Sequence, residues 1–202
     1  MPDFPPLYGA HPCLDFANTV DARGEPVHEE HLHDYADLAT WAAYAQWVDP
    51  GIARSLTARA EAQPSAAQAS YRAGIAVREA INRVFAALSG GEPPPSGDLA
   101  EIQRAYASAM AAARLEAHGD RFGWALPDGD LDRVWWPAAL AAIELLTAGP
   151  AGRVKTCAST LGCDGLFLDT SKNNSRRWCR MEDCGTEAKI HRQTDRRRAA
   201  RR

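Results

Sequence analysis

The sequence has no run of eighteen or more apolar residues, and its first twenty residues contain no basic segment followed by an apolar one. A membrane-spanning helix needs about 20 apolar residues. A secretory signal needs that order of charge and hydrophobicity. We therefore expect a cytoplasmic protein without a membrane partner. In such a reducing compartment, clustered cysteines bind metal more often than they form disulfides.

Residues 1–152 also lack the short motifs of common enzyme classes. They contain no G-x-S-x-G nucleophile turn, no Gly-rich phosphate loop and no H-E-x-x-H helix, and the chain has no internal repeat. Catalysis in this region through Asp15, Asn18 and the tryptophans is the least favoured of the functions we consider. We expect a protein that is not an enzyme.

Negative charge is scarce at one end of the chain. Residues 1–152 carry ten arginines and twenty acidic residues, a net of −10. Residues 153–202 carry thirteen basic and six acidic residues, a net of +7, so the two parts sum to the overall −3. This asymmetry favours a nucleic-acid-binding end on an acidic body. The alternative is that the basic tail docks on the body of the same molecule.

Four of the five cysteines lie in this basic end, as two pairs. Cys157 and Cys163 form a C-x5-C pair, Cys179 and Cys184 form a C-x4-C pair, and fifteen residues separate the pairs. Two short loops of this kind deliver four soft ligands to a tetrahedral metal, so the spacing predicts one structural Zn²⁺. Two disulfides or four free thiols are the alternatives. Cys13 stands apart, and we expect a buried free thiol there.

Apolar periodicity predicts a mainly α-helical fold. The helices are expected at residues 28–51, 52–62, 65–89, 98–113 and 130–149, with Asp34 and Asp98 as N-caps and a β-hairpin at residues 114–126. We divide the chain into a helical domain, residues 1–150, and a small treble-clef-like or ribbon-like zinc module, residues 151–202. The module is expected to have a strand at 166–169 and a helix starting near Cys184.

Two sets of residues in the helical domain are candidates for a ligand pocket. Asp15 and Asn18 lie three residues apart in LDFANTV, where they either line a pocket or make local capping bonds. Trp124 and Trp136 either line a cavity or pack in the core. His28, His31 and His33 lie near two glutamates, but their spacing favours a solvated helix entrance over a metal cluster.

The stretch FLDTSKNNSRRWCRMEDCG, Phe167 to Gly185, resembles the CGNR-type zinc finger, whose pattern is F-x-D-x-S-[RK]-N-x-S-R-R-W-C-x-M-x-x-C-G-N-R. The helical region beginning near LDFANTV resembles the ABATE domain found before that finger. The resemblance implies a bacterial "putative stress-induced transcription regulator" with a DNA-binding zinc finger. A small-molecule effector and a second copy of the chain are further candidate partners.

Two departures from the family pattern matter. Thr186 and Glu187 replace the family's Asn-Arg, which exchanges a cation for an anion, and the first cysteine pair is one residue longer. His191 is the alternative candidate for the fourth zinc ligand. The candidate phosphate-contacting residues are Lys172, Arg176, Arg177, Arg180, Lys189, Arg192, Arg196, Arg197 and Arg198. The leading hypothesis is a DNA-binding regulator, and the second is an adaptor that binds RNA or a protein.

Overall fold

The computed structural model describes residues 4–23, 28–160 and 162–199, apart from the side chains of residues 118, 195, 196, 198 and 199. Its helices and strands follow one another as α1 Pro12–Ala17, β1 Val20–Asp21, β2 Glu29–Glu30, α2 Tyr35–Tyr44, α3 Pro50–Ala62, α4 Pro64–Gly90, α5 Ser96–Ala112, β3 Arg114–His118, β4 Arg121–Ala125, α6 Trp136–Thr147, β5 Val154–Thr156, β6 Leu166–Leu168 and α7 Thr186–Ala199. Short 3₁₀ turns precede α6 and β5, and a π-helical turn, Met181–Gly185, precedes α7. The fold is mainly α-helical, as predicted.

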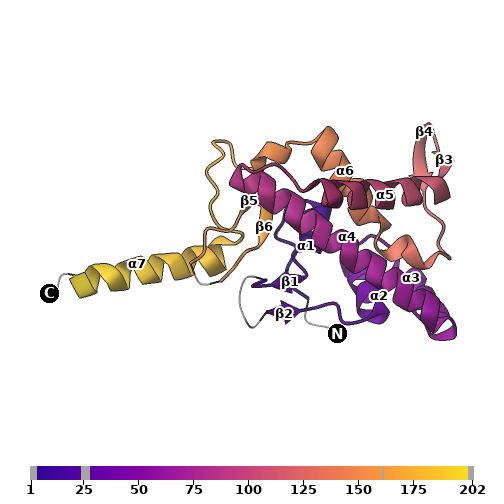
Figure 1. The fold of residues 1–202 in the computed structure, drawn as a ribbon, viewed down its shortest axis with the longest axis horizontal. Coiled ribbons are helices and arrows are strands. Elements are labelled where there is room, and N and C mark those ends of the chain that lie inside the picture. Colours follow the sequence, from indigo (N-terminus) through magenta and orange to yellow (C-terminus); the bar gives the residue numbers. More distant parts are fainter. Residues whose placement is uncertain (1–3, 24–27, 161, 200–202) are drawn as a thin grey trace.

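Helix α4 is the centre of the helical body (Figure 1). It has 27 residues, because Pro64 opens it with a fixed φ and Gly91 ends it in the left-handed conformation at φ 77°. Its buried face includes Val77, Ile81 and Phe85, which pack with residues of α1, α2, α5 and α6 in one core. Burial of this apolar stripe, rather than helix propensity alone, fixes the helix in place.

Several predicted elements are confirmed. Asp34 accepts a hydrogen bond from Asp37 N–H at 2.9 Å and caps α2. The hairpin of β3 and β4 pairs Leu115 with Trp124 across the strands. Figure 1 shows this hairpin standing out from the helices at the end of the molecule opposite α7. Cys13 is fully buried, as expected of a thiol outside the metal cluster.

Three boundaries were predicted wrongly. The predicted helix at residues 28–51 ends at Tyr44 rather than near Gly51, and before its Asp34 cap Glu29 and Glu30 pair with Asp21 and Val20 in a short antiparallel ladder. Asp98 does not cap α5, which starts at Ser96; its carboxylate binds Arg83 at 2.6 and 2.9 Å. The last helix starts at Thr186 rather than at Cys184. Each difference depends on a partner distant in sequence or on a turn that helical periodicity does not reveal.

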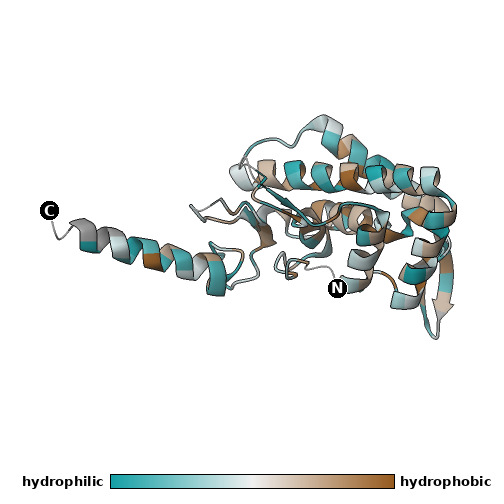
Figure 2. Ribbon diagram, turned by 90° about the horizontal axis from the view of Figure 1, so that it is seen from below, coloured by the Kyte–Doolittle hydropathy of each residue, from teal (hydrophilic) through white to brown (hydrophobic). Residues whose placement is uncertain are grey.

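The zinc module is packed on the body through shared core residues. Strands β5 and β6 pair antiparallel with Val154 opposite Leu168, and this partner of the predicted strand was missed. Val154, Leu166 and Leu168 are buried in the same core as the body's helices. From this base α7 extends away from the rest of the molecule (Figure 1). Figure 2 shows that most of its described residues are hydrophilic.

Candidate metal centre and nucleic-acid interface

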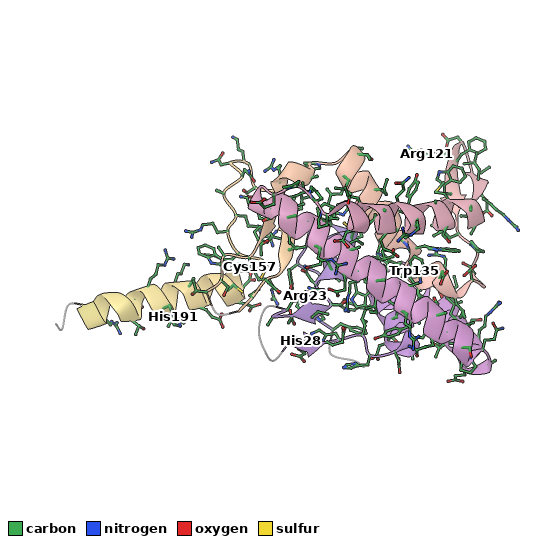
Figure 3. The ribbon with its side chains drawn as sticks, in the orientation of Figure 1. Arg23, His28, Arg121, Trp135, Cys157 and His191 are labelled. Atoms are coloured by element: carbon green, nitrogen blue, oxygen red, sulfur yellow. The ribbon has the colours of Figure 1, made fainter. Side chains whose placement is uncertain are left out.

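The four clustered cysteines are brought together by two backbone closures. Cys157 follows β5, and its N–H donates to the carbonyl of Gly165 at 2.9 Å, which folds the first pair into a loop. Ala158 N–H then donates to the carbonyl of Arg177 at 2.8 Å, which brings the second pair alongside. Figure 3 shows Cys157 at the junction between α7 and the body.

The sulfur positions fit a tetrahedral zinc. The Sγ atoms of Cys157, Cys163, Cys179 and Cys184 all lie within 4.8 Å of one another. Cys179 Sγ lies 3.6 Å from Cys163 Sγ and 3.7 Å from Cys184 Sγ. A Zn–S bond of 2.3 Å in a tetrahedron separates the sulfurs by about 3.8 Å. The longer first loop therefore still closes on the metal, and the four cysteines hold one structural Zn²⁺.

Crowding of four thiols controls their ionisation before metal binds. Thiol hydrogen bonds from Cys163 and Cys179 lower the pKa of Cys157 far below its usual range. The same interaction with Cys157 raises the pKa of Cys163 to about 12 and that of Cys179 still further. Burial raises the pKa of Cys184. Zinc must therefore displace protons from the sulfurs that remain neutral, which makes its binding pH-dependent.

A second polar centre, around the buried Asp169, orders the loop between the cysteine pairs. Its carboxylate accepts bonds from Lys155 Nζ at 2.6 Å, Ser171 N–H at 2.9 Å and Arg176 N–H at 2.9 Å. Burial raises the pKa of Asp169, but these donors outweigh burial and hold it well below its usual range. The Ser171 hydroxyl also donates to this carboxylate, at 2.5 Å, so Lys155, Ser171 and the turn amides are its donors among the described residues.

Arg176 is a structural residue and not a free phosphate-binding cation. Its guanidinium donates to the carbonyls of Trp178 at 3.1 Å and Tyr8 at 3.0 Å, and also to that of Cys179. Its Cζ atom lies 4.3 Å from the ring centroid of Phe167. The sequence pattern could not show this role, because one of the acceptors lies 168 residues away. Arg176 is removed from the candidate interface.

The segment before α1, which includes Tyr8 and Gly9, packs on the zinc module, a role that the sequence did not predict. Leu168 N–H donates to the carbonyl of Gly9 at 2.8 Å. Tyr8 packs against the zinc cluster, and a Cβ on Gly165 would lie 2.8 Å from its Oη. Burial raises the pKa of Tyr8 far above its usual value. Residue 165 therefore has to be glycine for the tyrosine ring to approach.

Asn18 connects the body to the module. Its Nδ2 donates to the carbonyl of Leu166 at 2.8 Å, and its Oδ1 accepts from Leu166 N–H at 2.9 Å. Asn18 is 2% exposed, so both of its amide groups are committed to this contact. Asp15 accepts from Gly9 N–H at 2.7 Å. These two residues therefore hold segments together instead of sharing a ligand pocket.

The two candidate tryptophans lie in different environments. Trp136 is 2% exposed in the core at the start of α6. Trp124 is 59% exposed on β4 and lines a surface groove at the base of the hairpin. The four residues proposed for one pocket are thus distributed over the core, the body–module contact and this groove.

The remaining basic candidates differ in solvent exposure and in the groups they contact. Lys172, Arg177, Lys189, Arg192 and Arg197 are exposed. Arg180 forms an ion pair with Asp183 at 3.0 Å, and Arg177 lies 5.2 Å from the ring of Trp178. The side chains of Arg196 and Arg198 lie outside the described ones. Exposed cations are therefore present on both the loop after β6 and on α7.

None of the described histidine side chains takes part in the four-sulfur centre. His191 is exposed partway along α7, away from Cys157 (Figure 3). His31 Nε2 lies 3.0 Å from Asp21 Oδ2, and His33 Nδ1 lies 3.0 Å from Asp37 Oδ2. His31, Asp21 and Glu29 have ligand atoms within 4.8 Å of one another, a grouping that the spacing of the three histidines did not predict.

A helical body carrying a four-cysteine module defines a zinc-finger protein. Residues 153–197 match the CGNR zinc finger. Residues 10–149 match the ABATE family, described as "putative stress-induced transcription regulator". The chain belongs to the ABATE family, with a CGNR zinc finger after it. None of the curated proteins compared with the chain matches it. None of the described helices is long and apolar enough to span a membrane.

Proposed function

We propose that the protein is a cytoplasmic transcription regulator that binds duplex DNA through its zinc module. The observation that carries this proposal is the placement of α7, which extends into solvent with exposed Lys189, Arg192 and Arg197 (Figure 1). Helix α7 contains five basic and two acidic residues, a net of +3. A basic helix of this kind contacts phosphates and can enter the major groove.

The acidic body favours one orientation on DNA. Its net charge of −10 repels the phosphate backbone, so the module is the end that approaches. A groove of about 600 Å³ beside the π-helical turn before α7 is lined by Ser175 and Arg177, among others. Its hydroxyl and guanidinium groups are suited to bind a backbone phosphate beside the helix. Loop and helix together would then fix the register of the module on the duplex.

Glu187 opposes this binding locally. It lies in the first turn of α7, where a carboxylate interacts favourably with the positive end of the helix. Thr186 Oγ1 donates to the carbonyl of Met181 at 3.1 Å and joins the helix to the preceding turn. These residues therefore stabilise the helix start at the cost of a cation there. The Glu187→Arg variant should bind DNA more tightly and make its binding more sensitive to salt.

The test is fluorescence anisotropy of labelled duplex DNA with the zinc-loaded full chain. The variant Lys189→Gln/Arg192→Gln/Arg197→Gln removes three exposed cations from α7. We expect its slope of log affinity against log salt to fall by about three, because each lost phosphate contact removes about one. The control, Arg54→Gln/Arg72→Gln/Arg121→Gln, removes three exposed cations from the body and hairpin. Equal slopes for the two variants would contradict the proposal.

An adaptor that binds RNA or a protein is the second candidate. Met181 is 48% exposed and Ile190 is 57% exposed, although both are apolar and lie in or next to α7. A protein partner would cover these side chains, whereas a phosphate backbone would not. Tighter anisotropy binding to RNA than to DNA of the same sequence would favour the RNA form of the adaptor.

The helical body is assigned a sensing or assembly role, and no catalytic role is proposed. Four thiolates close the coordination shell of the zinc, whereas a catalytic zinc keeps an open position for water or substrate. Arg78, a buried cation of the body, is engaged in structure: it binds both carboxylate oxygens of Glu30 at 2.7 Å. The test for a sensing role is a change in DNA affinity when a ligand binds the body.

A further inference from the structure

A groove of about 590 Å³ lies at the base of the β3–β4 hairpin, at the end of the body opposite α7. The hairpin forms one wall with Arg114, Glu116 and Trp124. Trp47, after α2, Arg133, in the 3₁₀ turn Leu131–Val134, and Asp128 also line it, together with apolar residues. This volume is within the range of small-molecule sites.

Arg133 is an unusual residue in this groove. Its Nε and Nη1 atoms are buried, and among the residues that the structure describes they have no hydrogen-bond acceptor. Burial lowers the pKa of the guanidinium, and the charge of Asp128 opposes that shift. A buried cationic donor without a partner is costly, because it has lost water and gained nothing in return. The groove therefore lacks an acceptor at this position.

The aromatic lining of the same groove is also incompletely covered. Trp124 is 59% exposed, although indole is among the largest apolar surfaces a protein can bury. Trp47 is held in place by an edge-to-face contact with Trp41, with ring centroids 4.6 Å apart. The groove thus places a rigid aromatic ring and an exposed one beside an unpaired guanidinium.

We propose that this groove binds a small aromatic carboxylate, with the carboxylate on Arg133 and the ring against Trp124. A carboxylate oxygen in the plane of the guanidinium accepts from Nε–H or from Nη1–H, which lie on different edges of the group. The ring covers the exposed indole. One ligand class thus supplies an acceptor at Arg133 and covers the exposed aromatic surface. Glu116 and Asp128 also line the groove and disfavour ligands with several negative charges.

Three probes separate the two parts of the ligand. Benzoate has both ring and carboxylate, acetate has only the carboxylate, and benzyl alcohol has only the ring. Each is added at millimolar concentration to the zinc-loaded full chain without DNA, and the Tm is measured. Benzoate should raise the Tm most, because binding to the folded state stabilises it. The absence of any benzoate effect, or an equal effect of benzyl alcohol, would overturn the proposal.

Arg133→Leu distinguishes a ligand site from a structural arginine. If the Arg133 guanidinium has an acceptor only when a ligand is bound, its replacement removes an unpaired buried charge. The Tm of the ligand-free chain should then rise by about 2–4 °C. The benzoate shift should disappear, with affinity at least about tenfold weaker. A lower Tm together with an unchanged benzoate response would refute the site. Arg121→Leu, on the same hairpin outside the groove, is the control.

A readout that does not depend on variant folding is the NMR signal of the Arg133 side-chain Nε–H in the wild-type chain. It should shift on titration with benzoate and remain in place with benzyl alcohol. The inference deepens the sensing role proposed above, but its tests use no DNA. A chain that binds benzoate without a change in DNA affinity would retain the site and lose only the regulatory link.

Discussion

The helical body and the zinc module are stabilised by different groups. The body buries large apolar side chains such as Trp41, Phe85 and Ile81 around α4. The module buries few, and its own cluster consists of Phe167 with three of the four zinc-ligating cysteines. Beside it, Asp169 and Arg176 satisfy the loop's backbone groups. A region of fewer than about 70 residues rarely builds an adequate core of its own, so metal and polar bonds replace hydrophobic burial there.

The two regions are nevertheless not independent. Leu166 and Leu168 belong to the core of the body, Asn18 bonds to the backbone of Leu166, and Thr156 N–H donates to Ser89 Oγ at 2.8 Å. The body can therefore supply part of the module's fold, while the module covers part of the body's core. Removal of stabilising groups on either side should reveal how strongly the two are coupled.

The largest effect is expected from loss of the zinc shell. Cys179→Ser removes a buried ligand, so the chain should bind much less than one zinc per molecule. The module should unfold, and the Tm of the body should fall because Leu166 and Leu168 lose their positions. Zinc content and thermal unfolding measure the two consequences separately.

Cys13→Ser is the matched control for this experiment. Cys13 is fully buried in the body, so its substitution affects packing but leaves all four zinc ligands. It should retain one zinc per chain. A Cys179→Ser chain that also retains one zinc and an ordered module would contradict the four-cysteine shell.

The next effect tests the coupling itself. Asn18→Ala removes both hydrogen bonds to Leu166 and leaves a buried N–H and a buried carbonyl without partners. Each orphaned group costs about 1–3 kcal/mol, so the free energy of unfolding should fall by about 2–6 kcal/mol. Zinc should also exchange faster with a chelator. Unchanged zinc exchange, with Asn173→Ala as the exposed control, would show that the module does not depend on this contact.

A smaller effect is expected where Tyr8 packs against Gly165 of the zinc module. Gly165→Ala places a Cβ 2.8 Å from Tyr8 Oη and 2.9 Å from the ring, so it should cost about 1–3 kcal/mol. Tyr8→Ala should relieve that clash. In a double-mutant cycle the two substitutions should therefore cost less together than the sum of their separate effects. Additive effects would mean that the tyrosine does not constrain residue 165.

The smallest effect compares one carboxylate from each region. Burial raises the pKa of Asp15 to about 6, above its unfolded value near 4, so its contribution to stability is lost as pH rises between about 4 and 6. Asp169 has the opposite shift, so its contribution is present above about pH 4 and is lost as pH falls. Asp15→Asn should thus stabilise the chain at pH 7 by on the order of 1–2 kcal/mol.

The Asp15→Asn substitution keeps an oxygen that can accept from Gly9 N–H. Its advantage should shrink as pH falls from 7 to 5, measured by urea unfolding at constant zinc. Asp120→Asn, at the exposed tip of the hairpin, serves as the control and should show no such trend. A constant advantage at both pH values would exclude burial of the Asp15 charge as its cause.

Local patterns in the sequence determined much of this protein. Helical periodicity with proline and glycine boundaries predicted α3, α4 and α6, and turn residues predicted the β3–β4 hairpin. Cysteine spacing predicted the zinc site. These signals work because each depends on residues within a few positions of one another, or on a metal that imposes its own geometry.

Tertiary structure alone decided the roles of Arg176, Asn18 and Arg133. In the sequence, Arg176 resembles a phosphate-binding residue. In the structure, its guanidinium donates to the carbonyls of Tyr8 and Cys179. Asn18 bonds to a strand 148 residues away, and Arg133 is left without an acceptor at the base of a hairpin. A charged or amide side chain has the same sequence signature whether it faces solvent, backbone or a groove. The partner that the fold provides determines its role.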